Sequence, residues 1–282
     1  MSDAAESDEA SGGWVTLAET APVLDLRTDQ PHTARMYDYY LGGKDNYPAD
    51  REAAEAAMTA NPNARATARA NRAFMTRAAR YLAESGVRQF LDIGTGLPTS
   101  PNLHETVQAV DPRARIVYVD NDPIVLVHAQ ALLTSHPEGM TAYVNADLRD
   151  PARILEADGL HRALDLNQPV AVSLIAILHF VPDDDEALHI VRTLLDPLPS
   201  GSCLSISHAA GDLDPAMDIV AAGYRDRGLP MVTRDRRRFA ALFAGLDLLE
   251  PGVVPFDRWR PDQPLTDDDA VAGGYGAVAR KS

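Results

Sequence analysis

Residues 90–96, with the sequence FLDIGTG, constrain the fold of this chain more than any other stretch. A short apolar run ends there at a carboxylate, and two glycines follow at positions 94 and 96. Glycine lets the backbone pass close to a ligand because it carries no Cβ. The stretch therefore predicts a strand, a tight turn and then a helix, with a ligand at the turn.

Acidic residues recur where the next strands are expected to end. Asp120 ends a predicted strand over 115–120, and Asp147 follows one over 141–145. The nearly continuous apolar run over 169–178 is typical of a strand covered on both faces. In an open α/β sheet, ligands bind outside the carboxyl ends of the strands, so these acids are expected to line one site.

Strand and helix patterns alternate from residue 88 onward. Strands are expected at 88–93, 115–120, 141–145, 169–178 and 202–208, and 247–256 and 273–280 fit a terminal hairpin. Helices are expected at about 99–110, 123–134, 151–158, 184–196, 214–227 and 235–245. This alternation predicts an α/β fold with a doubly wound, mostly parallel, Rossmann-like sheet of seven strands.

The chain divides into three parts by its pattern. Residues 1–22 are predicted to be a disordered tail, 23–86 an N-terminal helical extension or lid, and 87–282 the ligand-binding domain. Helices are expected over 48–60 and 62–85. The second holds five arginines, whose spacing favours a solvated face over a contact with an anionic partner: Arg65, Arg69, Arg72, Arg77 and Arg80.

Residues 31–47 contain four tyrosines, a Gly-Gly pair and a Lys-Asp-Asn run. One interpretation is a helix that ends at Gly42-Gly43 and packs on the core. The other is a lid that brings aromatic and polar groups over a ligand, and both can hold together. We expect residues 35–47 to fold over the ligand, with Tyr37 or Tyr40 against it.

Composition limits the partners and the setting. The formal net charge of −15 disfavours a nucleic-acid backbone as the main partner. No apolar run reaches the roughly 20 residues of a membrane span, and residues 1–13 do not resemble a signal peptide. The single Cys203 excludes an internal disulfide and fits a reducing cytoplasm. No Cys/His set has the spacing of a metal site.

Two acids and a leucine fit a ligand that contains adenosine. Asp120 can accept both hydroxyls of a ribose; the alternative is a helix-capping role, for which Asp122 is better placed. Asp147 can reach an adenine amino group, and Leu148 offers the base an apolar wall. The alternative for Asp147 is a loop aspartate in an Asx-turn.

The order and spacing of these motifs resemble those of class I S-adenosylmethionine-dependent methyltransferases. The matching positions are Asp92, Gly94, Gly96, Asp120, Asp147 and Leu178-His179-Phe180. Longer strings over 35–50, 92–105 and 118–123 look like methyltransferase family 19, first catalogued as a domain of unknown function, and the resemblance spans about residues 32–281. Pro98 stands where the broader class often has a third glycine.

The resemblance implies that residues at the strand ends bind S-adenosylmethionine. The methionine end would lie on Asp92, Gly94, Thr95 and Gly96. The adenosine end would lie on Asp120, Asn121, Asp147 and Leu148. The wall below the methyl group would be Ala176 and Ile177. The lid would add Tyr37, Tyr40 and Lys44, the last near the cofactor carboxylate.

The implied activity is methyl transfer to an unidentified acceptor, which we expect to be a small molecule. An NAD(P)-dependent oxidoreductase is one alternative, but it would normally carry a glycine at Thr99 and leaves Asp147 unexplained. A protein that binds the cofactor without turnover is another, because no residue is required as a catalytic base. The candidates for a base, each of which also fits a structural role, are His179, His208, Tyr37 and Tyr40.

Overall fold

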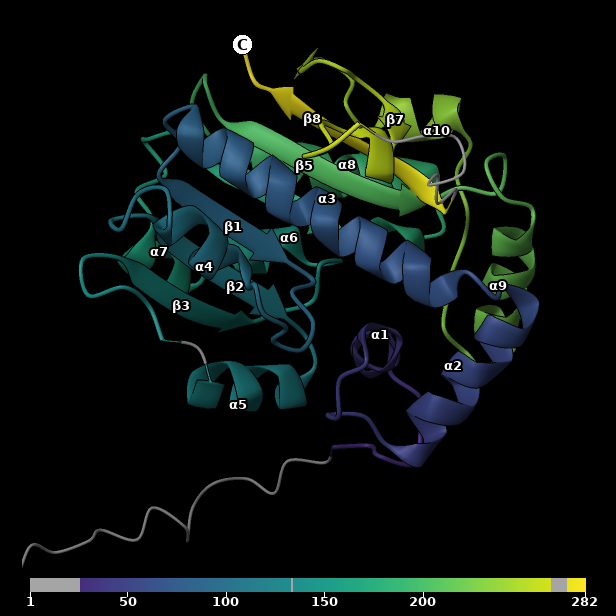
Figure 1. The fold of residues 1–282 in the computed structure, drawn as a ribbon. Coiled ribbons are helices and arrows are strands. Elements are labelled where there is room, and N and C mark those ends of the chain that lie inside the picture. The colour runs from purple at the N-terminus through teal and green to yellow at the C-terminus, as the bar shows by residue number, and fades with distance from the viewer. Residues whose placement is uncertain (1–25, 133, 265–272) are drawn as a thin grey trace, which may run out of the picture.

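The computed structural model describes residues 26–132, 134–264 and 273–282, so the predicted tail over 1–22 lies outside the described residues. These residues build one twisted sheet with helices on both faces (Figure 1). The predicted doubly wound α/β fold is therefore confirmed.

The sheet has the strand order β3-β2-β1-β4-β5-β8-β6. Its parallel strands are β1 (Gln89–Ile93), β2 (Arg115–Asp120), β3 (Met140–Asn145), β4 (Ala171–Ile175) and β5 (Cys203–Ala209). Three antiparallel strands complete it: β8 (Gly274–Arg280) pairs with β5, and β6 (Asp247–Leu248) and β7 (Val254–Pro255) pair with β8. The strand order reverses between β1 and β4, which is where open α/β sheets bind ligands.

Two layers of helices cover the sheet because its strands are apolar on both faces. One face carries α3 (Ala64–Glu84), which crosses it diagonally in Figure 1, and α4 (Leu103–Gln108). The other carries α6 (Pro151–Leu155), α7 (Asp158–Ala163), α8 (Asp184–Leu195) and α10 (Arg236–Ala241). The helix α5 (Pro123–Leu132) contacts β2 and β3. Neighbouring residues of β1 show the alternation: Phe90 faces α3, and Leu91 faces the α8 layer.

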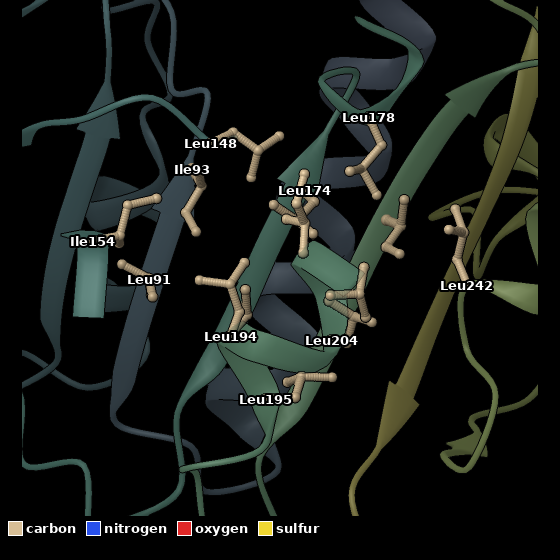
Figure 2. Close-up of a cluster of buried hydrophobic side chains, with 14 of the residues drawn as sticks. Leu91, Ile93, Leu148, Ile154, Leu174, Leu178, Leu194, Leu195, Leu204 and Leu242 are labelled. Carbon is tan, nitrogen blue, oxygen red and sulfur yellow. The ribbon is translucent and has the colours of Figure 1, made fainter. Parts of the chain in front are cut away.

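Leucine and isoleucine side chains form the core between the sheet and α8. Figure 2 shows Leu91 of β1, Leu174 of β4 and Leu204 of β5 in one cluster with Leu194 and Leu195 of α8. Burial of each such side chain contributes about 1.5–3 kcal/mol. This layer holds β1 and β4 rigidly side by side, and so fixes the positions at which both strands end.

The first helices pack at the end of the sheet rather than on its faces. Residues of α1 (Thr33–Leu41) and α2 (Pro48–Ala60) share a separate apolar cluster with α9 (Ala216–Arg225), and the three helices lie together in Figure 1. By contrast, the buried side chains of α3 from Phe74 onward belong to the core cluster between this helix and the sheet. The proposed division at residue 86 stays a prediction, and α3 is the part of that extension that packs on the sheet.

Two predicted elements are shorter than expected because the backbone turns. The apolar run over 169–178 is a strand only to Ile175, since Ala176 adopts φ +53° and Leu178–Phe180 form a 3₁₀ turn, η2. The stretch 247–256 yields only β6 and β7, which both pair antiparallel with β8, because the chain leaves the sheet between them in a loop that contains Gly252 at φ +77°.

Two helix predictions also change at their ends. The helix expected at about 99–110 begins at Leu103, where Asn102 and Glu105 form a reciprocal capping box. The helix expected over 151–158 ends at Leu155, and a second helix, α7, follows at once. The other helix and strand predictions agree with the structure to within a few residues.

Candidate active site

A cavity of about 320 Å³ opens at the carboxyl ends of the parallel strands, a size typical of small-molecule sites. Its walls come from the loops after β1 to β5 and from α1, α3 and α9. All but one of the predicted site residues line it: Tyr37, Tyr40, Asp92, Gly94, Thr95, Gly96, Asp120, Asn121, Asp147, Leu148, Ala176, Ile177, His179 and His208.

Lys44 is the exception, because its side chain is exposed and does not line the cavity. The Gly-Gly and Lys-Asp-Asn segment instead folds around the buried carboxylate of Asp38. Oδ2 of Asp38 accepts hydrogen bonds from the backbone N–H of Asp45 at 3.0 Å and from Nδ2 of Asn46 at 2.7 Å. A Cβ at Gly43 would overlap the same carboxylate. The position expected for Lys44 was wrong because this segment closes a turn after α1.

The two glycines of the first loop are required by its geometry. Gly94 and Gly96 adopt φ +74° and +67°, in the left-handed region. A Cβ on Gly94 would come within 2.6 Å of Cγ1 of Ile177, so the loop packs directly against the segment after β4. The backbone N–H of Gly96 donates to Oδ2 of Asp120 at 2.8 Å, which ties the loop to the end of β2.

Asp120 is held in one orientation by the backbone around it. Its Oδ1 accepts a hydrogen bond from the N–H of Asp122 at 2.9 Å, and its Oδ2 accepts the one from Gly96. Each carboxylate oxygen has two lone pairs, so both can accept a further hydrogen bond from a ligand. Asp122 caps α5 by accepting from the N–H of Ile124 at 2.9 Å, the role that the sequence suggested for it.

Two buried acids, Asp92 of β1 and Asp120 of β2, lie on neighbouring strands at the edge of the cavity. Burial raises the pKa of Asp92 to about 7, and the nearby charge of Arg72 only partly opposes this effect. Burial also raises the pKa of Asp120, against the hydrogen bonds from Asp122 and Gly96. An empty site with these two carboxylates therefore favours a cationic ligand.

Asp147 and Asn121 form a polar pair across the ends of β2 and β3. Nδ2 of Asn121 donates to Oδ2 of Asp147 at 3.0 Å. Oδ1 of Asp147 accepts from the N–H of Arg149 at 2.9 Å, which is the Asx-turn considered as an alternative. Asp147 thus forms this turn and lines the cavity at the same time.

The two tyrosines of α1 that line the cavity are hydrogen-bonded within the chain. The hydroxyl of Tyr37 donates to the carbonyl of Ala68 at 3.0 Å and accepts from Nδ2 of Asn71 at 2.8 Å. The hydroxyl of Tyr40 lies 2.9 Å from that of Tyr224. Burial raises the pKa of Tyr37, and that of Tyr40 to about 12. Both phenols are protonated at neutral pH, which makes them poor candidates for a base.

His208 and Arg234 form a buried pair that the sequence did not reveal. Nε2 of His208 lies 2.6 Å from Nη1 of Arg234, and Nδ1 lies 2.8 Å from the carbonyl of Ala209. Because the guanidinium can only donate, Nε2 accepts and Nδ1 carries the proton. Neither ring nitrogen is left for a substrate, so we assign His208 a structural role.

Arg234 also fixes the segment that carries His179. Its guanidinium donates to the carbonyl oxygens of Leu178 at 3.0 Å and of Val181 at 2.8 Å, and Nε donates to Oδ1 of Asp184 at 2.8 Å. His179 lies between two of these contacts. Burial, together with the charge of Arg234, lowers the pKa of His179 to about 3, so its imidazole is neutral.

Four buried polar atoms on the cavity wall have no hydrogen-bond partner among the described residues: Oγ1 of Thr67, Oδ1 of Asn71, Nε of Arg72 and Nδ1 of His179. Such atoms are rare in folded proteins, and these four are enclosed by protein rather than exposed on the cavity surface. Arg72 was predicted on a solvated face. A signal was available, because it follows Asn71 on the side of α3 that carries the buried residues Ala68 and Met75.

The comparison with protein-family models identifies one family. The model described as S-adenosyl methyltransferase matches residues 19–282. The chain belongs to this family. Its members use S-adenosylmethionine, and the resemblance seen in the sequence is confirmed. A search of the curated proteins found no match.

Solved structures with the same fold include two close relatives. A DUF574 family protein from Streptomyces avermitilis MA-4680 is 52% identical, with a TM-score of 0.87 over 91% of this chain and 100% of that one. A proposed methyltransferase from Thermobifida fusca YX is 38% identical, with a TM-score of 0.85 over 93% and 99%. The plantazolicin methyltransferase BamL, solved with a triazolic desmethylPZN analog and SAH, shares only 12% identity at a TM-score of 0.52, over 88% of this chain and 96% of that one.

No described helix is both long and apolar enough to cross a membrane. Over the same residues, no group of three or more His, Cys, Asp or Glu side chains is arranged to hold a metal ion.

Proposed function

We propose that this methyltransferase acts on a small molecule that binds beside S-adenosylmethionine in the strand-end cavity. The observation that carries the proposal is that the cavity has two chemically different halves. The half at the ends of β1 to β3 carries the acids Asp92, Asp120 and Asp147. The half between α1, α3 and α9 is largely apolar and is lined by Met75, Phe180, Met217, Val220, Leu229 and Met231.

The residues of the acidic half fit the cofactor group by group. Asp120 would accept the ribose hydroxyls, and the pair Asn121 and Asp147 would contact the adenine, with Leu148 as its apolar wall. Asp92 would face the ammonium group of the methionine end. Arg72, a cationic residue of the cavity wall, fits its carboxylate, the role that the sequence had suggested for Lys44.

The sulfonium of the bound cofactor supplies an activated methyl group. The protein then has to align the methyl donor with the acceptor and to exclude water. Alignment alone can account for most of the rate enhancement of a methyl transfer over the uncatalysed reaction. Gly94 and Ile177 pack against each other and would lie below the cofactor, while Tyr37 and Tyr40 of α1, which line the same cavity, would cover it. We keep a cytoplasmic setting as part of the proposal, because the single cysteine, Cys203, leaves no pair for an internal disulfide.

Calorimetry on the purified protein tests the cofactor half. We expect S-adenosylmethionine and S-adenosylhomocysteine to bind in the micromolar range, about 8 kcal/mol, and NAD to show no saturable binding. Incubation with an accepted substrate should then produce S-adenosylhomocysteine. Tight binding of NAD with no binding of either methionine derivative would rule the proposal out.

The raised pKa of Asp92 predicts that cofactor binding releases a proton. Asp92 is largely protonated in the empty site below about pH 7 and must ionise to face the ammonium group, so affinity should rise with pH up to about 7 and then level off. Calorimetry at about pH 6 in two buffers of different ionisation enthalpy measures the released proton. Asp92→Asn should abolish the release, and an unchanged release in that variant would contradict the assignment.

The same shift has a consequence for the protein without ligand. The unfolded carboxyl ionises near about pH 4, whereas Asp92 in the folded state keeps its proton up to about pH 7. Between these values the folded state binds more protons. The contribution of Asp92 to the free energy of unfolding is therefore fully present below about pH 4. It is lost as the pH rises from about 4 to about 7.

A further inference from the structure

We infer that Arg35, which does not line the cavity, is a positioning residue for the cofactor, because it holds the ribose-binding acid Asp120 in place through Asp122. This inference rests on the proposed function, since it concerns how the same site binds the ribose. Three observations carry it: the buried charges around Arg35, the apolar contacts beside them, and the two hydrogen bonds that orient Asp120.

The guanidinium of Arg35 lies between two buried carboxylates. Its Nε lies 3.5 Å from Oδ1 of Asp50, which belongs to α2, and 3.8 Å from Oδ2 of Asp122, which caps α5. All three side chains are at most 5% exposed. Water and salt screen buried charges much less than exposed ones. Arg35 is therefore the cation that links the first helices to the loop after β2.

The chain around Arg35 fixes the position of its guanidinium. The two Nη atoms donate to three carbonyl oxygens within residues 26–30, at 3.1 to 3.4 Å. Oδ1 of Asp50 accepts a hydrogen bond from the N–H of His32 at 2.8 Å, which ties the start of α1 to α2. Nδ1 of His32 also lies 3.1 Å from Oδ2 of Asp122. The start of α1 is thus attached to the cofactor side of the cavity by its charged and polar groups.

An apolar cluster beside these charges makes the same attachment. Its buried members come from the glycine loop after β1 and from the first turn of α5: Leu97, Ile124 and Val125. Its partly buried members come from the N-terminal segment: Leu26, Ala34 and Tyr47. The N-terminal segment therefore packs against both of the loops that meet at Asp120.

Both backbone groups that orient Asp120 belong to these two loops. The N–H of Gly96, the residue before Leu97, donates to Oδ2 of Asp120 at 2.8 Å, and the N–H of Asp122 donates to Oδ1 at 2.9 Å. A hydrogen bond weakens steeply when its distance or angle changes. The carboxylate can accept two ribose hydroxyls only while both loops keep their positions, and Arg35 holds the second of them.

The geometry of the ion pair shows what Arg35 supplies. Nε of Arg35 and Oδ2 of Asp122 are too far apart for a direct hydrogen bond, and neither atom has a hydrogen-bond partner among the described residues. Arg35 therefore acts on Asp122 mainly through its charge. A lysine at this position keeps the charge, whereas a methionine keeps only an apolar stem, so the two variants separate charge from packing.

The test uses the full-length protein with two ligands, S-adenosylhomocysteine and its 2′,3′-dideoxy analogue, which lacks both ribose hydroxyls. Calorimetric titration gives the ratio of their affinities. We expect the wild-type protein to bind S-adenosylhomocysteine roughly 10- to 150-fold more tightly. Arg35→Met should reduce this ratio by about 2- to 30-fold, the range expected of a residue that acts through another. Arg35→Lys should recover part of the loss.

Two further variants separate this role from a general effect on the fold. Asp122→Asn keeps an oxygen to cap α5 and leaves Arg35 paired with Asp50, so it should fold and still reduce the ratio. It decides the question if Arg35→Met does not fold. Arg65→Met is the matched control, because Nη1 of Arg65 donates to the carbonyl oxygen of Tyr39 at 3.2 Å, at the other end of α1. Its ratio should equal that of the wild type.

The outcomes distinguish this inference from the proposed function. A wild-type protein that does not bind S-adenosylhomocysteine would overturn the proposed function itself. A wild-type protein that binds both ligands equally would overturn the ribose role of Asp120 and this inference with it. A wild-type ratio retained in folded Arg35→Met or in Asp122→Asn, or an equal fall of the ratio in Arg65→Met, would overturn only the role of Arg35.

Discussion

Replacing Arg234 by alanine is expected to lower the free energy of unfolding by about 3–5 kcal/mol, the cost of leaving a buried polar network without its partner. Arg234 is 1% exposed. Its loss would leave Nε2 of His208 and the carbonyl oxygen of Val181 without a donor in the core, and would leave the carbonyl of Leu178 with only the N–H of Val181. Chemical denaturation followed by circular dichroism measures the change.

Arg238 provides a matched control on the same partner. It makes two hydrogen bonds to the carboxylate of Asp184, at 2.8 and 2.9 Å, but its side chain is 37% exposed. An ion pair of this kind contributes only about 0–1 kcal/mol, so Arg238→Ala should be nearly neutral. Equal losses in the two variants would show that Asp184, and not the buried network, gives Arg234 its importance.

Replacing Asp120 by alanine is expected to weaken S-adenosylhomocysteine binding by about 1.5–3 kcal/mol, or roughly 10- to 150-fold. The variant loses the hydrogen bonds that a charged carboxylate would make to the ribose. It also loses the acceptor for the N–H of Gly96, so the glycine loop is held less firmly. Calorimetric titration of both proteins measures the difference.

Asp120→Asn is the control for shape. Its side-chain oxygen can still accept from Gly96 or from one ribose hydroxyl, so its affinity should lie between those of the wild type and the alanine variant. Unchanged affinity in Asp120→Ala, together with a large fall in melting temperature, would instead assign Asp120 to holding the β1 and β2 loops together.

The strand ends were predictable because their signals are local. The first loop shows this, because its acid and its two glycines lie within five positions, at 92, 94 and 96. The positive φ angles of these glycines are set by the turn itself and need no distant residue. Asp120 and Asp147 could be placed because parallel strands bring their carboxyl ends to one edge. Apolar alternation and strand length were enough to give the order of elements.

Arg234 and Arg72 could not be assigned in the same way. The partners of Arg234 come from residues 178–184 and from His208, which lie 26 to 56 positions away in sequence. Helical spacing could have placed Arg72 on the buried side of α3, but its position near Asp92 depends on how α3 packs across the sheet. Such contacts depend on the finished tertiary structure, whereas Lys44 lies outside the cavity because of a local turn around Asp38.

The hydrogen bond between Tyr40 of α1 and Tyr224 of α9 joins residues 184 positions apart. A ribosome that adds about 5–20 residues per second needs roughly 10–40 s to travel between them. During that interval the apolar side of α1 and α2, with Met36, Ala53 and Ala57, has no α9 to cover it. The cavity is therefore completed late in synthesis, and the nascent N-terminal helices are the segment most in need of protection while translation proceeds.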